Sequence, residues 1–196
     1  MPTVLRVFAA SVVFALAQVG AGTPRWAADV PVKVWIDTPS APKGADALVE
    51  RAMKTWSDAL GEGLRLERAR DRDSAALRVN FVAGDHVYGE ARPRVDRGAI
   101  VGADVFISRD LAAAGDALEQ QIILYLTALH EIGHALGLRH TDDFTTIMYS
   151  FRRPDDGARY FGAYRRRLRS AGDIGSERAT GLAPADIDAL RALYGR

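Results

Sequence analysis

The chain has 196 residues, with 26 basic and 25 acidic side chains, a formal net charge of +1 and 48% hydrophobic residues. This length and composition are typical of a single soluble globular domain with its own core, and the near-zero charge gives no indication of nucleic-acid binding. Because there is no cysteine, disulfide bonds, thiolate metal sites and a cysteine nucleophile are excluded. Only four histidines are present, and three of them lie between positions 130 and 140.

The N-terminal residues 1–21 have the features of a signal peptide. Arg6 precedes an apolar stretch over 7–19, and Val19 and Ala21 supply the small residues for cleavage after Ala21. We therefore expect a secreted or periplasmic protein without stable membrane association after cleavage. The apolar stretch is too short for a comfortable membrane span; an uncleaved anchor and a first core helix are the alternatives.

After a short linker over 22–29, the rest of the chain, 30–196, is expected to form one domain whose first half is rich in strands. Alternating apolar and polar residues predict these strands, over 32–36, 64–67, 77–81, 87–93 and 99–108. Pro93 indicates that its strand lies at a sheet edge, because proline cannot donate to a β-ladder. In the last strand we expect one shared face for Val101, Ala103, Val105 and Ile107.

Helical periodicity predicts helices over 45–60, over 118–136 and from Pro184 to Leu193. Gly61 is expected to cap the first of them. Between 152 and 178 the composition shifts to Arg, Gly and Asp with little periodicity, and we expect a long surface loop. Strands followed by helices indicate an α+β fold, in which a twisted sheet is covered by helices. Both Trp35 and Trp56 are expected in its core.

The chemistry of the chain is concentrated in one motif, HEIGHALGLRH at 130–140. His130 and His134 are four residues apart, so they project from one face of the predicted helix and can bind one Zn²⁺ ion. Gly137 permits a sharp turn after the helix, which allows His140 to return as a third ligand. Three protein ligands leave one position for water, an arrangement typical of catalytic zinc sites and not of structural ones.

Glu131 follows the first ligand, where its carboxylate can reach the open position on the metal and act as a general base. The alternative is a buried helix whose histidines bond only to backbone carbonyls. That alternative leaves the charged Glu131 unexplained beside the apolar run 123–126, because burying an unpaired carboxylate is costly.

This motif resembles the long zinc signature of the metzincin metalloproteases. Downstream, the sequence TTIMY at 145–149 is similar to the Met-turn of that clan, with Met148 as its methionine. Three details are most similar to the matrixin branch, which includes the matrix metalloproteinases. They are the short distance from His140 to Met148, Thr141 after the last ligand, and Tyr149 after the methionine.

The resemblance implies a metzincin or zincin-like fold, with a twisted, mostly parallel sheet that has an antiparallel edge strand and is packed by an active-site helix and a C-terminal helix. In such a domain the aspartate that matches Asp186 anchors the Met-turn, and an extended substrate adds to the edge strand near Gly89 and Ala91. Ser150 and Ala185 depart from the family pattern, which usually has a proline and a second aspartate at these positions.

The motif and the resemblance together predict a secreted zinc-dependent endopeptidase with one catalytic Zn²⁺ ion. The expected ligands are His130, His134 and His140, and the expected base is Glu131. The expected partner is an extended peptide or protein substrate, with no nucleic acid, and the chain is expected to be a monomer. A catalytically silent zinc-containing module that binds a peptide or an inhibitor is the alternative, and a zinc hydrolase of non-peptide amides or esters is a second.

Other polar groups give weaker signals. His86 beside Asp85 is interpreted as a solvated loop histidine and not as a second zinc site. Scattered aspartates such as Asp104 do not define a calcium site. The basic run over 165–169 is interpreted as a solvated loop face, with binding to an anionic surface or a contribution to substrate choice as the alternatives.

Overall fold

The computed structural model describes residues 22–27, 31–61, 63–83, 88–110 and 115–195. The predicted signal peptide over 1–21 and the pair Asp85 and His86 lie outside these residues. Among the described residues, no helix is both long and apolar enough to cross a membrane.

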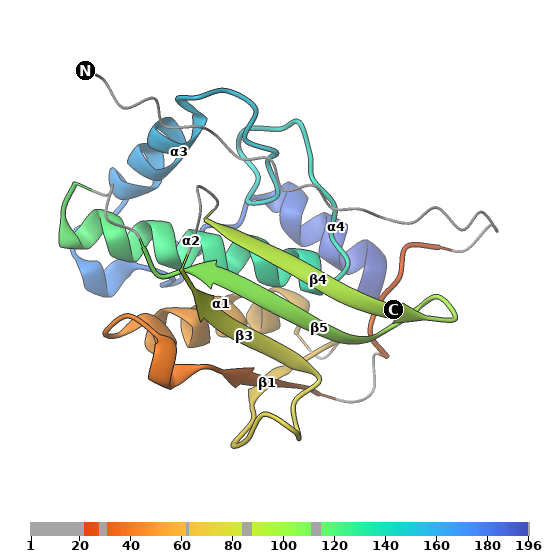
Figure 1. The fold of residues 1–196 in the computed structure, drawn as a ribbon. Helices are drawn as coiled ribbons and strands as arrows, with labels where there is room; N and C mark the ends of the chain where they lie inside the picture. Colours follow the sequence, from red (N-terminus) through yellow and green to blue (C-terminus); the bar gives the residue numbers. More distant parts are fainter. Residues whose placement is uncertain (1–21, 28–30, 62, 84–87, 111–114, 196) are drawn as a thin grey trace.

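In the described part of the chain, the domain is built on one five-stranded sheet (Figure 1). Its strands are β1 (Val32–Ile36), β2 (Leu66–Arg68), β3 (Leu77–Val82), β4 (Gly89–Asp96) and β5 (Ala99–Ser108). Their order across the sheet is β2-β1-β3-β5-β4, with β4 antiparallel to β5 at one edge and every other neighbouring pair parallel. The mostly parallel sheet with an antiparallel edge strand is therefore confirmed.

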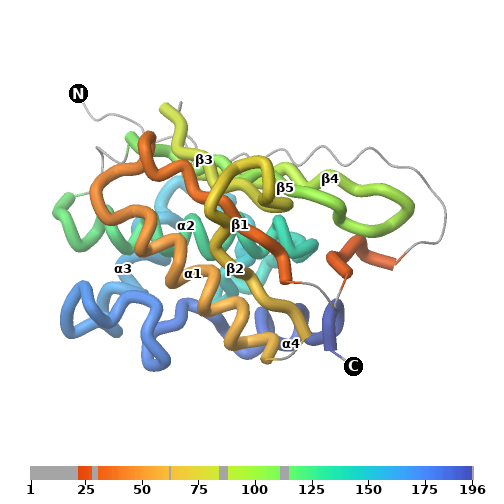
Figure 2. The backbone as a smooth tube through the Cα atoms, turned by 90° about the horizontal axis from the view of Figure 1, so that it is seen from below, coloured from red at the N-terminus to blue at the C-terminus, as the bar shows by residue number. Residues whose placement is uncertain are grey.

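The helices lie together on one side of this sheet (Figure 2). Within the described ranges they are α1 (Ala45–Leu60), α2 (Ala117–Ala135), α3 (Asp156–Arg165) and α4 (Pro184–Tyr194), with short 3-10 helices at Thr38–Ser40 and Ala171–Asp173. Helix α2 packs against α1, β4 and β5, and its residues 122–135 are all buried. This helix is therefore the centre of an α+β domain, as expected.

The observed boundaries of β1, α1 and β5 agree with the predicted ones. Gly61 ends α1 with a φ of 62°, in the region that favours glycine. Strand β2 begins at Leu66 and not at Leu64, and α2 begins one residue earlier than expected, at Ala117. Pro93 lies in the edge strand β4, as predicted.

The predicted inner face of β5 is wrong at one position, because Val101 is 56% exposed whereas Ile100 is 3% exposed. A β-bulge explains the difference. Pairing passes from Arg94 with Gly102 to Val95 with Ile100, so that Val101 is the extra residue on its strand. The extra residue reverses the in–out alternation at this point.

The predicted loop over 152–178 is also wrong, because this segment contains α3 and the 3-10 helix Ala171–Asp173. The side chains of Tyr160, Phe161 and Tyr164 are buried. They recur at helical spacing, and their burial offsets the entropy lost when a segment rich in arginine and glycine becomes ordered.

Three further side chains differ from their expected environment. Arg165 is not in a solvated loop but ends α3, and its guanidinium donates to the Asp116 carboxylate at 2.7 and 3.0 Å. Trp35 is only partly buried, with the Arg72 guanidinium 5.4 Å from its ring centre; Trp56 is fully buried, as expected. Trp26, in the expected linker, is 6% exposed and therefore belongs to the folded domain.

Candidate active site

Helix α2 positions the predicted zinc ligands and the predicted base. It begins after Asp116, whose side chain accepts a hydrogen bond from the Glu119 amide at 2.9 Å. It ends at Ala135, and the chain then turns at Gly137, which has a φ of 96°. A Cβ atom at Gly137 would also overlap the Pro24 carbonyl oxygen, so both the dihedral angle and the space require glycine here.

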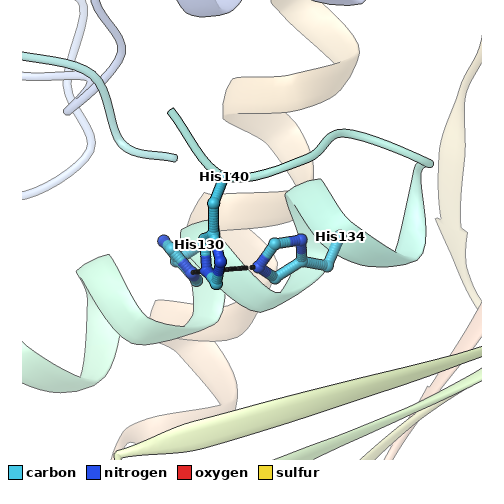
Figure 3. Close-up of side chains that lie close together, drawn as sticks. All are labelled: His130, His134 and His140. Carbon is cyan, nitrogen blue, oxygen red and sulfur yellow. Dashed lines mark hydrogen bonds between the residues drawn. The ribbon is translucent and has the colours of Figure 1, made fainter. Parts of the chain in front are cut away.

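The three predicted ligands meet at one point. Figure 3 shows His130 and His134 on α2 and His140 on the following loop, with their rings pointing toward one another. The Nε2 of His130 lies 3.1 Å from that of His134 and 3.2 Å from that of His140, and the remaining pair is 3.0 Å apart. A tetrahedral zinc ion with nitrogen ligands separates neighbouring ligand atoms by about 3.3 Å. The triad therefore fits one zinc ion after a small outward adjustment.

The outer ring nitrogens fix the tautomers of two ligands. His130 Nδ1 lies 2.6 Å from the Ile147 carbonyl oxygen, and His134 Nδ1 lies 2.9 Å from that of Leu138. A carbonyl oxygen only accepts, so each Nδ1 donates its proton and each Nε2 faces the centre with a lone pair. Lone pairs this close repel each other unless a cation lies between them, which supports a metal site.

The environment of the triad also keeps its imidazoles neutral. Burial lowers the pKa of His130 to about 3 and that of His134 to about 4, and repulsion from neighbouring rings adds to the effect. Burial, together with the positive charge of Arg152, lowers the pKa of His140 as well. The three rings are therefore neutral at pH 7, and His130 and His134 present an unprotonated Nε2 to a metal ion.

Glu131 is a buried carboxylate beside these rings. It is 2% exposed, and among the described residues its Oε2 atom has no hydrogen-bond partner. Burial, and then repulsion from Glu90, raises the pKa of Glu131 to about 8. A divalent cation at the triad would counter both effects and favour the carboxylate.

The predicted Met-turn packs directly against α2. A Cβ atom at Gly133 would lie 2.6 Å from Met148 Sδ, so the methionine contacts bare helix backbone between the first two ligands. Asp186, in the first turn of α4, accepts a hydrogen bond from the Ile147 amide at 2.9 Å. Since the Ile147 carbonyl holds His130, this carboxylate connects α4 to the first predicted ligand.

A narrow apolar pocket lies next to His130 and Glu131, with a free volume of about 10 Å³, which is about enough for one water molecule. Its walls come from α2, the Met-turn and α3, and its aromatic members are Phe151, Tyr160 and Phe161. The sequence pattern did not place these aromatic residues in the site, because they lie in or beside the expected loop. The helical spacing of the aromatic residues in α3 was the signal that could have predicted this helix.

Helix α3, which carries the pocket wall, is fastened to the Met-turn by buried hydrogen bonds. The Tyr149 hydroxyl donates to the Asp156 carboxylate at 2.9 Å, and the Tyr160 hydroxyl donates to the Thr146 carbonyl at 2.9 Å. Asp156 is 1% exposed, so its pairing with Tyr149 is shielded from solvent. The pocket wall and the histidine site therefore form one connected unit.

Among the described residues, β4 is an edge strand of the sheet, and it lies beside Glu131. The Ser108 amide donates to the Tyr88 carbonyl at 2.9 Å, so every second pair from there along the antiparallel ladder is hydrogen-bonded. Gly89 and Ala91 belong to the intervening pairs, and their backbone amides and carbonyls point to the open edge. Both residues are buried on the face that packs against α2.

The chain is similar to known proteins over most of its length. A model of the matrixin family matches residues 32–160. The chain is 27% identical over 184 residues to interstitial collagenase of Oryctolagus cuniculus, covering 89% of this chain and 34% of that protein. It is 24% identical over 187 residues to stromelysin-1 of Mus musculus, with the same coverage.

Metalloendoproteinase 1 of Glycine max is 26% identical over 189 residues, covering 88% of this chain and 53% of that protein. The chain thus spans about a third of the length of the collagenase and the stromelysin, and about half of the plant enzyme. The matched region includes β1, the histidine motif, the Met-turn and the first half of α3. The chain belongs to the matrixin family.

Proposed function

We propose that the chain is a zinc endopeptidase in which Glu131 acts as the general base for hydrolysis of a peptide bond. One observation carries the proposal. Three neutral imidazoles converge on one point, and beside them lies the buried Oε2 atom of Glu131, which has no hydrogen-bond partner among the described residues. Matrixins use a catalytic zinc ion, and the spacing of the three Nε2 atoms fits such an ion.

The residues of this chain have distinct tasks in the proposed reaction. A zinc ion held by His130, His134 and His140 would supply a Lewis acid that polarises the scissile carbonyl and lowers the pKa of water toward about 7. Glu131 takes a proton from the attacking water and delivers it to the leaving amine. The backbone carbonyls that hold the imidazoles keep the ligands from rotating during the reaction.

The substrate is proposed to bind as an extended peptide along the free edge of β4. The outward backbone groups of Gly89 and Ala91 support this position, because they can pair with an added strand. The apolar pocket beside Glu131 supports one specificity site, since a side chain next to the scissile bond would enter it. Its small free volume favours a side chain of modest size over a large aromatic one.

The proposal includes export of the chain from the cytoplasm. The apolar stretch over 7–19, with small residues at the positions expected for cleavage after Ala21, supports a signal peptide. The chain would then act as a monomer outside the cytoplasm on peptide or protein substrates.

Cleavage of an unfolded protein such as casein tests the function directly. Purified wild type and Glu131→Gln are compared, with the zinc content of both determined by elemental analysis. We expect cleavage by wild type, chelator-sensitive and restored by Zn²⁺, and no cleavage by a variant that still contains one zinc ion. If neither protein cleaves casein or a peptide library although both bind zinc, the endopeptidase function is wrong and a binding module takes its place.

A further inference from the structure

The carboxyl end of α2 is held by side chains from both ends of the described chain. The last carbonyl groups of an α-helix have no amide partner within the helix. In α2 two of them receive distant donors: Trp26 Nε1 donates to the Ala135 carbonyl at 2.8 Å, and the Tyr194 hydroxyl donates to the Leu136 carbonyl at 2.6 Å. Trp26 is 6% exposed and Tyr194 is 2% exposed, so both hydrogen bonds are shielded from water.

Trp26 and Tyr194 are also bonded to each other, because the Trp26 backbone amide donates to the Tyr194 hydroxyl at 3.1 Å. The neighbouring Arg25 donates to the Leu193 carbonyl at 2.6 Å, and its own carbonyl accepts from the Ile100 amide at 2.9 Å. Figures 1 and 2 both show this N-terminal segment beside the end of α4. The N-terminal segment, α4 and the end of α2 are thus joined in one network.

The turn that this network holds serves two of the three predicted ligands. The Leu138 carbonyl accepts from His134 Nδ1 at 2.9 Å, which fixes that tautomer. Two residues further along the chain is His140. The Pro24 carbonyl fills the space beside Gly137 at the centre of the turn. A shift of the turn would therefore disturb the orientation of one ligand and the position of another.

We propose that Trp26 and Tyr194 are positioning residues of the zinc site, which hold the carboxyl end of α2 so that His134 and His140 meet His130. The role rests on the zinc site of the proposed function but not on peptide cleavage. Outer hydrogen bonds to metal ligands typically contribute 10- to 100-fold to metal affinity. Because Tyr194 acts one step further from the metal, the expected loss on removing its hydroxyl is at the lower end, about tenfold.

The chain contains a matched control for Tyr194→Phe. The Tyr164 hydroxyl likewise accepts from an amide, that of Gly175 at 3.0 Å, and donates to a carbonyl, that of Ala179 at 2.5 Å. Tyr164 is also buried, at 4% exposed, but its partners are not part of the histidine turn. Tyr164→Phe therefore removes the same hydrogen bonds from a comparable environment.

The experiment measures the zinc dissociation constant of the full chain by competition with a chromophoric chelator, with circular dichroism of the metal-free proteins as a check on folding. Tyr194→Phe is expected to bind zinc about tenfold more weakly than wild type, and Tyr164→Phe to stay within about twofold. Trp26→Phe keeps a buried ring but loses the donor to Ala135, and it should weaken zinc binding in the same direction.

Equal zinc affinity of Tyr194→Phe or Trp26→Phe and wild type would overturn the proposal, as would an equal loss in Tyr164→Phe. The measurement contains no substrate, so its result is independent of peptide cleavage. A wild type that binds zinc but cleaves nothing would contradict the proposed function and leave the positioning role intact.

Discussion

The bare Cα of Gly89 lies against the side chain of Glu131: a Cβ atom at this position would be 2.7 Å from Glu131 Cγ and 3.0 Å from Oε1. The Thr127 Cγ2 atom, one helical turn earlier on α2, closes the same space at 2.8 Å. Since these distances are shorter than van der Waals contact, the edge strand and the carboxylate fit together only because residue 89 has no side chain.

Gly89→Ala should therefore displace the Glu131 carboxylate while leaving the three imidazoles in place. We expect kcat for a peptide substrate to fall roughly 10- to 100-fold, since misplacement of a catalytic group by about 1 Å costs this much, with unchanged zinc content. Steady-state kinetics and elemental analysis provide the measurements. The control is Ala91→Gly, which changes one methyl group on the same face of β4 and should alter kcat little; an unaltered kcat in Gly89→Ala would contradict the packing argument.

The stability of the metal-free protein should depend on pH in both directions. His130 and His134 have pKa values of about 3 and about 4 in the fold, below the unfolded value of 6.5, so their contribution is complete above pH 6.5 and is lost as the pH falls from 6.5 to about 3. Glu131 has a pKa of about 8 in the fold against 4.5 when unfolded, so its contribution is complete below pH 4.5 and is lost as the pH rises to 8.

The sum of these effects is a maximum near pH 6.5. The free energy of unfolding should rise between about pH 4.5 and 6.5, because the histidines together outweigh Glu131 there, and fall from pH 6.5 to about 8, where Glu131 alone changes. Urea unfolding of chelator-treated protein, followed by circular dichroism, measures it. Glu131→Gln should abolish the fall above pH 6.5, and a fall that persists in this variant would refute the assignment to Glu131.

Phe161→Leu should widen the apolar pocket beside Glu131. Phe161 is 5% exposed and lines this pocket from α3, so a smaller side chain there should shift cleavage of a peptide library toward bulkier apolar residues next to the scissile bond. Phe144→Leu is the control, because Phe144 belongs to the same aromatic cluster through Tyr149 and Tyr160 but does not line the pocket. A shift of equal size in both variants would mean that the pocket does not select the side chain.

Asp186→Ala should weaken both the fold and the zinc site. Its Oδ2 atom accepts from the Ile147 amide at 2.9 Å and from the Ala183 amide at 2.8 Å, and the side chain is 2% exposed. Loss of these two charge-assisted hydrogen bonds should lower the free energy of unfolding by roughly 2–4 kcal/mol. Asp186→Asn keeps an acceptor oxygen and should lower the free energy of unfolding by less. Chemical denaturation measures this free energy for both variants. Equal losses in the two would exclude the hydrogen bonds as the cause.

Much of the fold was predictable because its signals are local. The alternation in 32–36 and the helical spacing with Gly61 in 45–60 gave β1 and α1 with their observed boundaries. The arrangement of the three histidines is likewise determined within the motif at 130–140, since helix spacing and one glycine bring them together. Such features need no information about distant segments.

The parts that were not predicted depend on contacts with residues outside the segment itself. Val101 is exposed because of a bulge that forms between β4 and β5, and no residue pattern within β5 indicates it. Helix α3 is stabilised by contacts to the Met-turn, through Asp156 and Tyr160, which outweigh its unfavourable composition. Trp26 is likewise ordered by two acceptors more than a hundred residues away, the Tyr194 hydroxyl and the Ala135 carbonyl.

Pro93 limits the length over which another strand can pair with the outer edge of β4. It follows Gly89 and Ala91 at the next outward-facing position of the ladder, where it offers a carbonyl but no amide proton. An added strand therefore finds two complete docking points and then an interruption, and the bulge at Arg94 and Val95 bends the strand immediately afterwards. The same residue that would keep a bound segment short would also hinder edge-to-edge association with copies of the protein.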